Sequence, residues 1–273
     1  MAKINTGRNL PLAILVGVSL ISLVILTLFI NKFAFTFLAW AAVVIAGYEI
    51  TNQLNIKLNL TISKSIVMFL ISLFIFLPIL FGQIAIIYAI ISTIILLMIF
   101  ISLSSKENKK KDLKYSFFTV LYLGLFGSLA ILMLLTKDGA QRVFIFIAIT
   151  AISDTGGYFA GIIFGKTKLA PKISPNKSYE GLIGSIFFAI IFSFFVVPYF
   201  LDLSLIENII LGLVLAITGT IGDLFESYIK RKLSIKDFST FLPGHGGMAD
   251  RIDSLAFNSL FSFLLFGLFL GFM

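Results

Sequence analysis

Two aspartates lie inside stretches of sequence that are otherwise strongly apolar. Asp154 falls within "AISDTGGYFAG", and Asp223 falls within "TGTIGDLFESYIKR". A carboxylate in the hydrocarbon layer of a membrane costs about 3 kcal/mol on insertion scales, so each side chain needs a partner or a water-filled cavity. One interpretation is a structural acid that accepts hydrogen bonds from Ser, Thr or backbone groups. The other is a site that carries out chemistry.

The residues that follow Asp223 favour chemistry because of their spacing. Glu226, Ser227 and Lys230 come three, four and seven residues after Asp223. Side chains at intervals of three and four residues lie on one face of a helix. The sequence therefore predicts a polar face that carries two carboxylates, a hydroxyl and an amine.

A second pair of acids precedes the last apolar stretch. Asp250 and Asp253 are three residues apart. If the last helix begins early enough to include both, they share a face, where two carboxylate ligands could hold Mg²⁺. The alternative for Asp253 is a cap on the exposed amides at the start of that helix. Capping does not account for Asp250 or for the basic residues upstream.

Two further segments could bind phosphate near these acids. Residues 164–181, "FGKTKLAPKISPNKSYEG", contain four lysines, and Pro171 and Pro175 restrict the backbone, which favours a shaped loop. Lysine binds phosphate as a point charge. The chain's one histidine, His245, has glycines on both sides, so the backbone there can approach a ligand closely. The alternatives are a positively charged loop that flanks the membrane and an ordinary loop histidine.

The rest of the chain must hold these groups in a bilayer. The 273 residues are 59% hydrophobic and only 12% charged, against about 25% charged residues in soluble domains. A helix needs about 20 mostly apolar residues to cross a membrane. Nine stretches fit and predict an all-α, polytopic integral membrane protein; their limits are 11–31, 33–50, 65–82, 84–103, 116–135, 143–163, 181–201, 209–229 and 254–272.

The distribution of positive charge predicts the orientation. With a cytoplasmic N-terminus, 18 of the 21 Lys and Arg residues lie in cytoplasmic segments and 3 lie outside. Cytoplasmic loops carry an excess of Lys and Arg, so this split favours a cytoplasmic N-terminus and an outer C-terminus. Residues 1–115 then form an N-terminal region of four spans that ends in a basic cytoplasmic loop, and residues 116–273 form a C-terminal catalytic region of five spans. Because topology accounts for the positive charge, the net charge of +8 does not predict nucleic acid as a partner.

Acids beside cytosolic cations suit phosphate chemistry. Metal ions held by carboxylates bridge the phosphates of a nucleotide, and Lys and Arg neutralise the charge that remains. A nucleotide could enter from the cytosol while a lipid phosphate arrives through the membrane. The chain has no Cys, which excludes disulfides, thiolate metal sites and cysteine nucleophiles. It also has no P-loop, HExxH or GxSxG element that would predict a different chemistry.

The segment "SYIKRKLSIKDFSTFLPGHGGMADRID", residues 227–253, resembles the signature of the phosphatidate cytidylyltransferases, also called CDP-diacylglycerol synthases. A second block, residues 153–181, resembles the middle region of that family, with mild departures at Gly157, Asn176, Ser178 and Tyr179. Spans one to five resemble the family only in general character. The matching positions of the first segment are Ser227, Lys230, Arg231, Lys236, Asp237, Pro243, His245, Gly246, Gly247, Asp250, Arg251 and Asp253.

The resemblance implies transfer of CMP from CTP to phosphatidic acid, which gives CDP-diacylglycerol and pyrophosphate with Mg²⁺ as cofactor and room for a second metal ion. It also implies a homodimer in a prokaryotic inner membrane, with the active site facing the cytoplasm. The implied catalytic residues are Asp223, Ser227, Lys230 and Asp250. The implied metal ligands are Asp223, Asp250 and Asp253. The implied substrate-binding residues are Asp154, Lys172, Asn176, Lys177, Arg231, Lys236, His245 and Arg251.

Two alternatives stay open at this stage. A related CTP-dependent cytidylyltransferase or a kinase could act on another lipid with the same kind of site. An ion-coupled transporter also places acids inside membrane helices beside glycines. A transporter predicts acids in both halves of the membrane, whereas the clusters here lie towards the predicted inner side.

Overall fold

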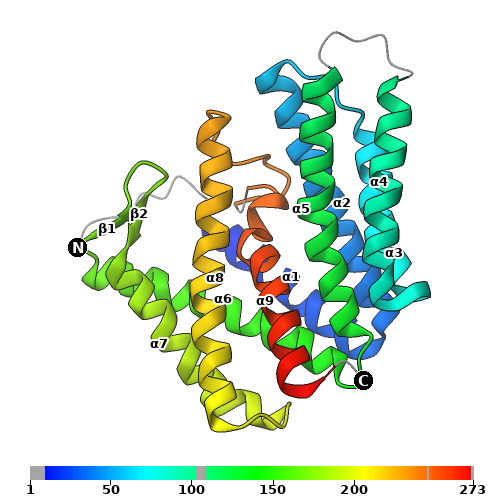
Figure 1. The fold of residues 1–273 in the computed structure, drawn as a ribbon. Coiled ribbons are helices and arrows are strands. Elements are labelled where there is room, and N and C mark those ends of the chain that lie inside the picture. Colours follow the sequence, from blue (N-terminus) through cyan, green and yellow to red (C-terminus); the bar gives the residue numbers. More distant parts are fainter. Residues whose placement is uncertain (1–9, 103–108, 245, 272–273) are drawn as a thin grey trace.

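The computed structural model describes residues 10–102, 109–244 and 246–271. Within these ranges the chain forms nine α-helices, which Figure 1 colours in chain order from blue to red. The prediction of an all-α fold is confirmed. The helices are α1 (Leu10–Ile30), α2 (Lys32–Leu58), α3 (Lys64–Phe81), α4 (Ala85–Ser102), α5 (Lys109–Leu134), α6 (Gly139–Phe164), α7 (Tyr179–Val196), α8 (Leu205–Lys232) and α9 (Asp253–Leu270), with short 3₁₀ turns η1 (Gly82–Ile84), η2 (Val197–Tyr199) and η3 (Ala249–Arg251).

Seven helical stretches in the described residues are long and apolar enough to cross a membrane. One of them, Lys64–Phe100, contains α3 and most of α4, which η1 separates and which pack against each other (Figure 1). Helix α1 contributes a shorter apolar stretch, Leu15–Ile30. The chain is therefore a multi-pass membrane protein. Nine crossings and a cytoplasmic N-terminus stay predictions.

Several helices extend beyond the limits that hydropathy predicts. Helix α2 continues to Leu58, although its apolar run ends near residue 50, and α5 begins at Lys109 instead of residue 116. Helix α8 covers Leu205–Lys232, against predicted limits of 209–229. Lys, Glu and Gln have good helix propensity, so a helix continues through them outside the hydrocarbon layer. Hydropathy therefore finds these helices but underestimates their length.

The helices form two groups that meet where α5 packs against α9. Helices α2 to α5 form one group and α6 to α9 form the other (Figure 1). One cluster of buried side chains, which includes Ile131, Leu211 and Phe266, joins the two groups. A second cluster includes Ile50 and Val120 and contains no residue of α6 or α7. The site described below lies at the end of the molecule where this second cluster is found.

Two connections at that end carry residues that the sequence singles out. Between α6 and α7 the chain forms an antiparallel hairpin of β1 (Lys168–Ala170) and β2 (Ser174–Ser178). The predicted shaped loop is thus a β-hairpin, and Tyr179 closes it by donating its backbone N–H to Thr167 O at 2.9 Å. Between α8 and α9 lie residues 233–252, which we call the C-terminal loop. Phe238 of this loop is buried in the second cluster.

The start of α9 approaches the backbone of α8 at Gly222. A Cβ atom placed on Gly222 would lie 2.8 Å from Asp253 O and 3.2 Å from Phe257 Cβ. Real Cβ atoms do not approach a carbonyl oxygen this closely, so only glycine allows the two helices to meet here. This contact brings Asp223 on α8 next to Asp253 on α9.

We expect Gly222→Ala to force the start of α9 away from α8 and to lower the free energy of unfolding by about 1–3 kcal/mol, the usual cost of overpacking. Thermal unfolding in detergent micelles would measure the loss. The matched control is Gly161→Ala on α6, where the nearest atoms to a new Cβ lie at 3.5 and 3.7 Å. A Gly222 variant as stable as the Gly161 variant would contradict the expectation.

Candidate active site

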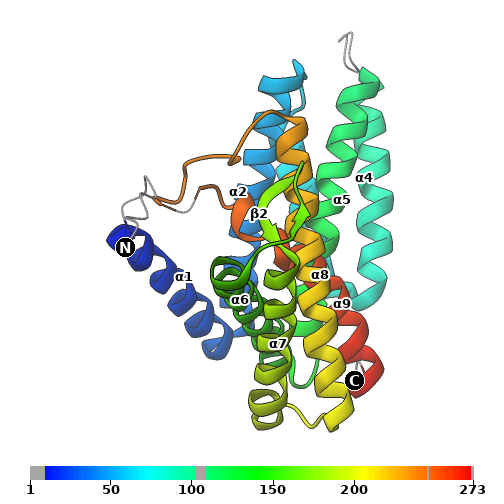
Figure 2. The same ribbon diagram turned by 90° about the vertical axis from the view of Figure 1, so that its left-hand side faces the viewer.

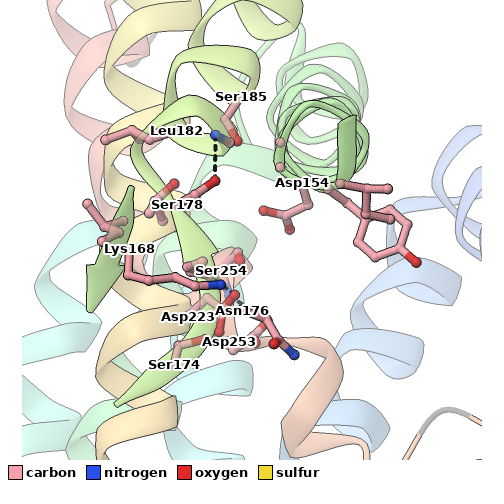
Figure 3. Close-up of a pocket in the computed structure, with 18 of the residues that line it drawn as sticks. Asp154, Lys168, Ser174, Asn176, Ser178, Leu182, Ser185, Asp223, Asp253 and Ser254 are labelled. Carbon is pink, nitrogen blue, oxygen red and sulfur yellow. Dashed lines mark hydrogen bonds and ion pairs between the residues drawn. The ribbon is translucent and has the colours of Figure 1, made fainter. Parts of the chain in front are cut away.

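A cavity of about 730 Å³ lies between α6, the hairpin, the start of α7, α8 and the start of α9 (Figure 3). Its volume is within the range of small-molecule sites, roughly 300–1,000 Å³. Most of its lining side chains are polar or charged. Eight of the residues that the sequence assigns to the site line it: Asp154, Asn176, Lys177, Asp223, Lys230, Asp250, Arg251 and Asp253.

The polar face of α8 is confirmed. Ser227 Oγ donates a hydrogen bond to Asp223 Oδ1 at 3.3 Å, and Lys230 Nζ lies 2.8 Å from Glu226 Oε1, one helical turn away. The other oxygen of Asp223, Oδ2, lies 2.6 Å from Lys177 Nζ on strand β2. Lys177 of the hairpin therefore pairs with the carboxylate of Asp223 on α8, and both residues line the cavity.

Lys230 is the centre of a buried ion network. Its ammonium group contacts Glu226 Oε1 and Asp250 Oδ1, both at 2.8 Å. All three residues are buried. An ion pair out of water is favourable only where geometry and further hydrogen bonds are good, and removal of one partner leaves a buried charge. Lys230 thus cross-links α8 to the C-terminal loop as well as lining the cavity.

Asp250 has a different environment from the one that its spacing suggests. Helix α9 begins at Asp253 and not earlier, so Asp250 lies in the 3₁₀ turn η3 and the two aspartates do not share a helical face. Asp250 Oδ2 accepts the backbone N–H groups of Phe238 and Gly247, both at 2.9 Å, while Oδ1 accepts from Lys230. The carboxylate therefore organises the C-terminal loop.

Asp253 and Asp154 face the cavity from opposite sides. Figure 3 shows Asp253 close to Asp223, whereas Asp154 extends from α6 across the open space. Asp253 does not cap α9 as predicted, because it is the first residue of the helix and the N-cap, Ile252, has no side-chain cap hydrogen bond. Asp253 Oδ1 accepts the adjacent N–H of Ser254 at 2.8 Å.

Four other predicted residues that the structure describes do not line the cavity: Lys172, Ser227, Arg231 and Lys236. Lys172 is exposed at the tip of the hairpin, and Lys236 is exposed on the C-terminal loop. Arg231 is exposed too, and its Nε donates to Ile173 O of the hairpin at 3.2 Å, which ties α8 to the hairpin. His245 lies outside the described residues.

The sequence analysis missed Glu49, which lies on α2 and contacts the C-terminal loop. Ala249 donates its backbone N–H to Glu49 Oε2 at 2.9 Å, and Met248 donates to Oε1 at 3.1 Å. A signal for Glu49 was present, because it is an acid at the end of the apolar stretch "AAVVIAGYE", as Asp154 and Asp223 are acids in theirs. The segments that resemble the family, residues 153–181 and 227–253, lie in the C-terminal half of the chain and do not include Glu49.

The donor set suits a hard cation that a substrate helps to bind. Among the described residues, no three His, Asp or Glu side chains converge closely enough to hold a metal by themselves. Mg²⁺ is usually bound through one or two carboxylates plus the phosphates of a substrate, with water in the remaining positions. Asp223 and Asp253 fit that pattern, and the ammonium of Lys177 beside Asp223 Oδ2 marks a position where positive charge is stabilised. Asp250 fits less well because Lys230 and two amides already contact its carboxylate.

Comparison with known proteins identifies the family of the chain. Residues 12–269 match the profile of the "Cytidylyltransferase family". A phosphatidate cytidylyltransferase of Mycobacterium leprae is 31% identical over 267 residues, which cover 92% of this chain and 85% of the relative. A protein with the same name from Haemophilus influenzae is 42% identical over 45% of this chain and 45% of the relative. Another from Staphylococcus aureus is 42% identical over 44% of this chain and 47% of the relative. The chain therefore belongs to the cytidylyltransferase family.

Proposed function

We propose that this protein is a phosphatidate cytidylyltransferase, which transfers CMP from CTP to phosphatidic acid and releases pyrophosphate. The observation that carries the proposal is the cavity, where carboxylates of α6, α8 and α9 face lysines of the hairpin and Arg251. Such a mixture of acids and cations suits a metal-bound nucleotide. The name of the Mycobacterium leprae relative, which aligns over most of the chain, supports the same substrates.

A lipid substrate can reach the cavity from the side. Tyr158 and Ile162 of α6 line the cavity, and their side chains are 61% and 57% exposed. In a membrane-spanning helix such apolar side chains face lipid, so the cavity has an apolar rim beside its polar floor. Phosphatidate could place its headgroup among the lysines while its acyl chains stay in the bilayer.

The reaction needs positioning more than acid–base catalysis. A phosphate oxygen of phosphatidate forms a bond to the α-phosphorus of CTP, and the bond from that phosphorus to the bridging oxygen of the β-phosphate breaks, so pyrophosphate leaves with the electron pair. The attacking phosphate is already ionised and needs no strong general base. Lys177 and Arg251 would neutralise the phosphates, and Asn176 would donate hydrogen bonds. Ser227 holds Asp223 in place.

We also propose that Asp223 and Asp253 would hold Mg²⁺ and that Asp154, on the opposite wall, would be available to a second ion. When bound, the metal would stabilise the charge that develops on the leaving pyrophosphate. The proposal also places the cavity on the cytoplasmic side of an inner membrane, where CTP is available, in agreement with the distribution of Lys and Arg. We further propose that the protein is a homodimer, as the family resemblance implies.

Metal removal provides a direct prediction. We expect excess chelator to reduce pyrophosphate release from CTP and phosphatidate to background, because carboxylates alone repel the triphosphate. Addition of Mg²⁺ above the chelator concentration should restore it, and the same concentration of Na⁺ should not. Turnover that persists in chelator would contradict the metal-dependent part of the proposal.

An assay of substrate choice tests the proposal as a whole. Purified protein in mixed micelles would be given CTP or ATP together with phosphatidate or a polyprenyl alcohol, and pyrophosphate and the lipid product would both be measured. We expect turnover with CTP and phosphatidate. Turnover with another lipid or with ATP would identify a related transferase or a kinase, and solute uptake by liposomes in the absence of nucleotide would indicate a transporter.

A further inference from the structure

The C-terminal loop lies against α2, a helix that contributes no residue to the cavity lining among the described residues. The 3₁₀ turn η3, which immediately precedes α9, contacts α2, and Figure 2 shows this part of the chain in front of α2. Gln53 of α2 donates its side-chain amide to Phe238 O at 2.7 Å. The loop that carries Asp250 and Arg251 is therefore held from the opposite side of the molecule to the hairpin.

Glu49 makes the central contact between α2 and this loop. Its side chain is only 4% exposed and accepts three hydrogen bonds, from Ser239 Oγ and from the backbone N–H groups of Met248 and Ala249. The donors lie 190, 199 and 200 residues away in sequence. Hydrogen bonds to an ionised acceptor are about twice as strong as neutral ones and fix the donor geometry more closely.

Three consecutive backbone amides, at residues 247–249, donate to the carboxylates of Asp250 and Glu49. Gly247 N–H donates to Asp250, and the next two N–H groups donate to Glu49. A Cβ on Gly247 would lie 2.6 Å from Glu49 Oε2 and 3.0 Å from Asp250 Oδ2. The close approach of both acids therefore requires glycine at residue 247. The hydrogen bonds to these acids fix the backbone immediately before η3.

We infer that Glu49 is a positioning residue for nucleotidyl transfer: it holds the 247–249 backbone so that Asp250, Arg251 and Asp253 face the cavity. This inference rests on the function proposed above. Glu49 does not itself line the cavity, so it acts through the residues that follow the amides it binds. Displacement of a positioned group by about 1 Å can cost on the order of 10²-fold in rate, which is why such a support affects catalysis.

The chain offers a matched control for a purely structural acid. Asp112 of α5 is also buried and accepts from Thr61 N at 3.1 Å and from Thr61 Oγ1 at 2.7 Å, which ties α5 to the connection between α2 and α3. It is a carboxylate of similar burial that holds a loop through one amide and one hydroxyl. It does not line the cavity.

The test compares Glu49→Gln with Asp112→Asn. Glutamine keeps the size of the side chain but presents an NH₂ group to an N–H donor, so at least one of the three hydrogen bonds is lost. We expect Glu49→Gln to raise the KM for CTP about 10-fold and to lower kcat. Asp112→Asn should leave the KM for CTP unchanged. A smaller amount of correctly folded enzyme lowers the apparent kcat but does not change KM.

Hydrogen exchange gives a second readout that does not depend on the reaction. In Glu49→Gln, peptides that contain Met248 and Ala249 should exchange faster than in the unmodified protein, whereas Asp112→Asn should not change their exchange. If Glu49→Gln does not fold, Ser239→Ala replaces it, because it removes one donor to Glu49 and should shift both readouts in the same direction by a smaller factor.

The outcomes separate the inference from the proposed function. Unmodified protein that does not use CTP with phosphatidate would overturn the proposed function, while faster exchange at 248–249 would still support the role of Glu49 in holding the loop. Unmodified protein that turns over, together with a Glu49 variant whose KM and exchange match those of the Asp112 variant, would overturn the inference.

Discussion

Asp223→Asn is expected to lower turnover with CTP and phosphatidate by about 10³-fold, the scale of losing one electrostatic contact that the transition state requires. Asparagine keeps the shape of the side chain and can still accept from Ser227, which lies 3.3 Å from Asp223 Oδ1. It cannot balance the charge of Lys177, 2.6 Å from Oδ2, or bind a divalent cation as an ionised ligand. The measurement is the initial rate of pyrophosphate release at saturating substrate.

Insertion and folding should survive this change. Removal of a partly buried negative charge lowers a desolvation cost, so thermal unfolding in micelles should change little. The matched control is Asp202→Asn, an exposed aspartate in the connection between η2 and α8, for which we expect unchanged turnover. An Asp223 variant with full activity would remove this carboxylate from the mechanism.

Lys230→Met is expected to lower the free energy of unfolding by about 3–5 kcal/mol, the usual result when one partner of a buried ion pair is removed. Methionine fills a similar volume but leaves Glu226 and Asp250 facing each other without the ammonium that contacts both at 2.8 Å. Denaturant titration in mixed micelles would measure the loss. Lys232→Met, at an exposed lysine on the same helix, is the control and should change the stability much less.

A double variant tests the physical reason for this loss. If the cost comes from uncompensated charge, Lys230→Met combined with Glu226→Gln should be more stable than Lys230→Met alone, since one of the two buried charges is gone. A double variant that is less stable than the single one would indicate that packing, and not charge, explains the effect of Lys230.

The helices and the polar face of α8 could be predicted from the sequence because both depend on local information. Hydropathy over about 20 residues locates a membrane helix. The spacing of Asp223, Ser227 and Lys230 places them on one face whatever the helix packs against. The exact ends of the helices could not be read in the same way, since polar residues continue α2 and α5 beyond the apolar layer.

Contacts between distant segments could not be predicted from spacing. The partners of Glu49 are about 200 residues away in sequence, and nothing local to "AAVVIAGYE" specifies them. The start of α9 was ambiguous because Asp250 and Asp253 are both of a residue type that is favoured at an N-cap. The actual conformation of Asp250 depends on distant partners, Lys230 and the amides of the C-terminal loop. The β-hairpin is too short to have a reliable periodic pattern.

The contact between α2 and the C-terminal loop has a consequence for how related chains can be recombined. Glu49, Ser239 and Gly247 form a matched set, because the acid needs the hydroxyl donor and the glycine leaves space for it. A chimera that joins the first helices of one relative to the last helices of another would take Glu49 from one parent and the loop that donates hydrogen bonds to it from the other. Such hybrids should succeed only where both parents share this set, so sequence changes at these three positions should be correlated through evolution.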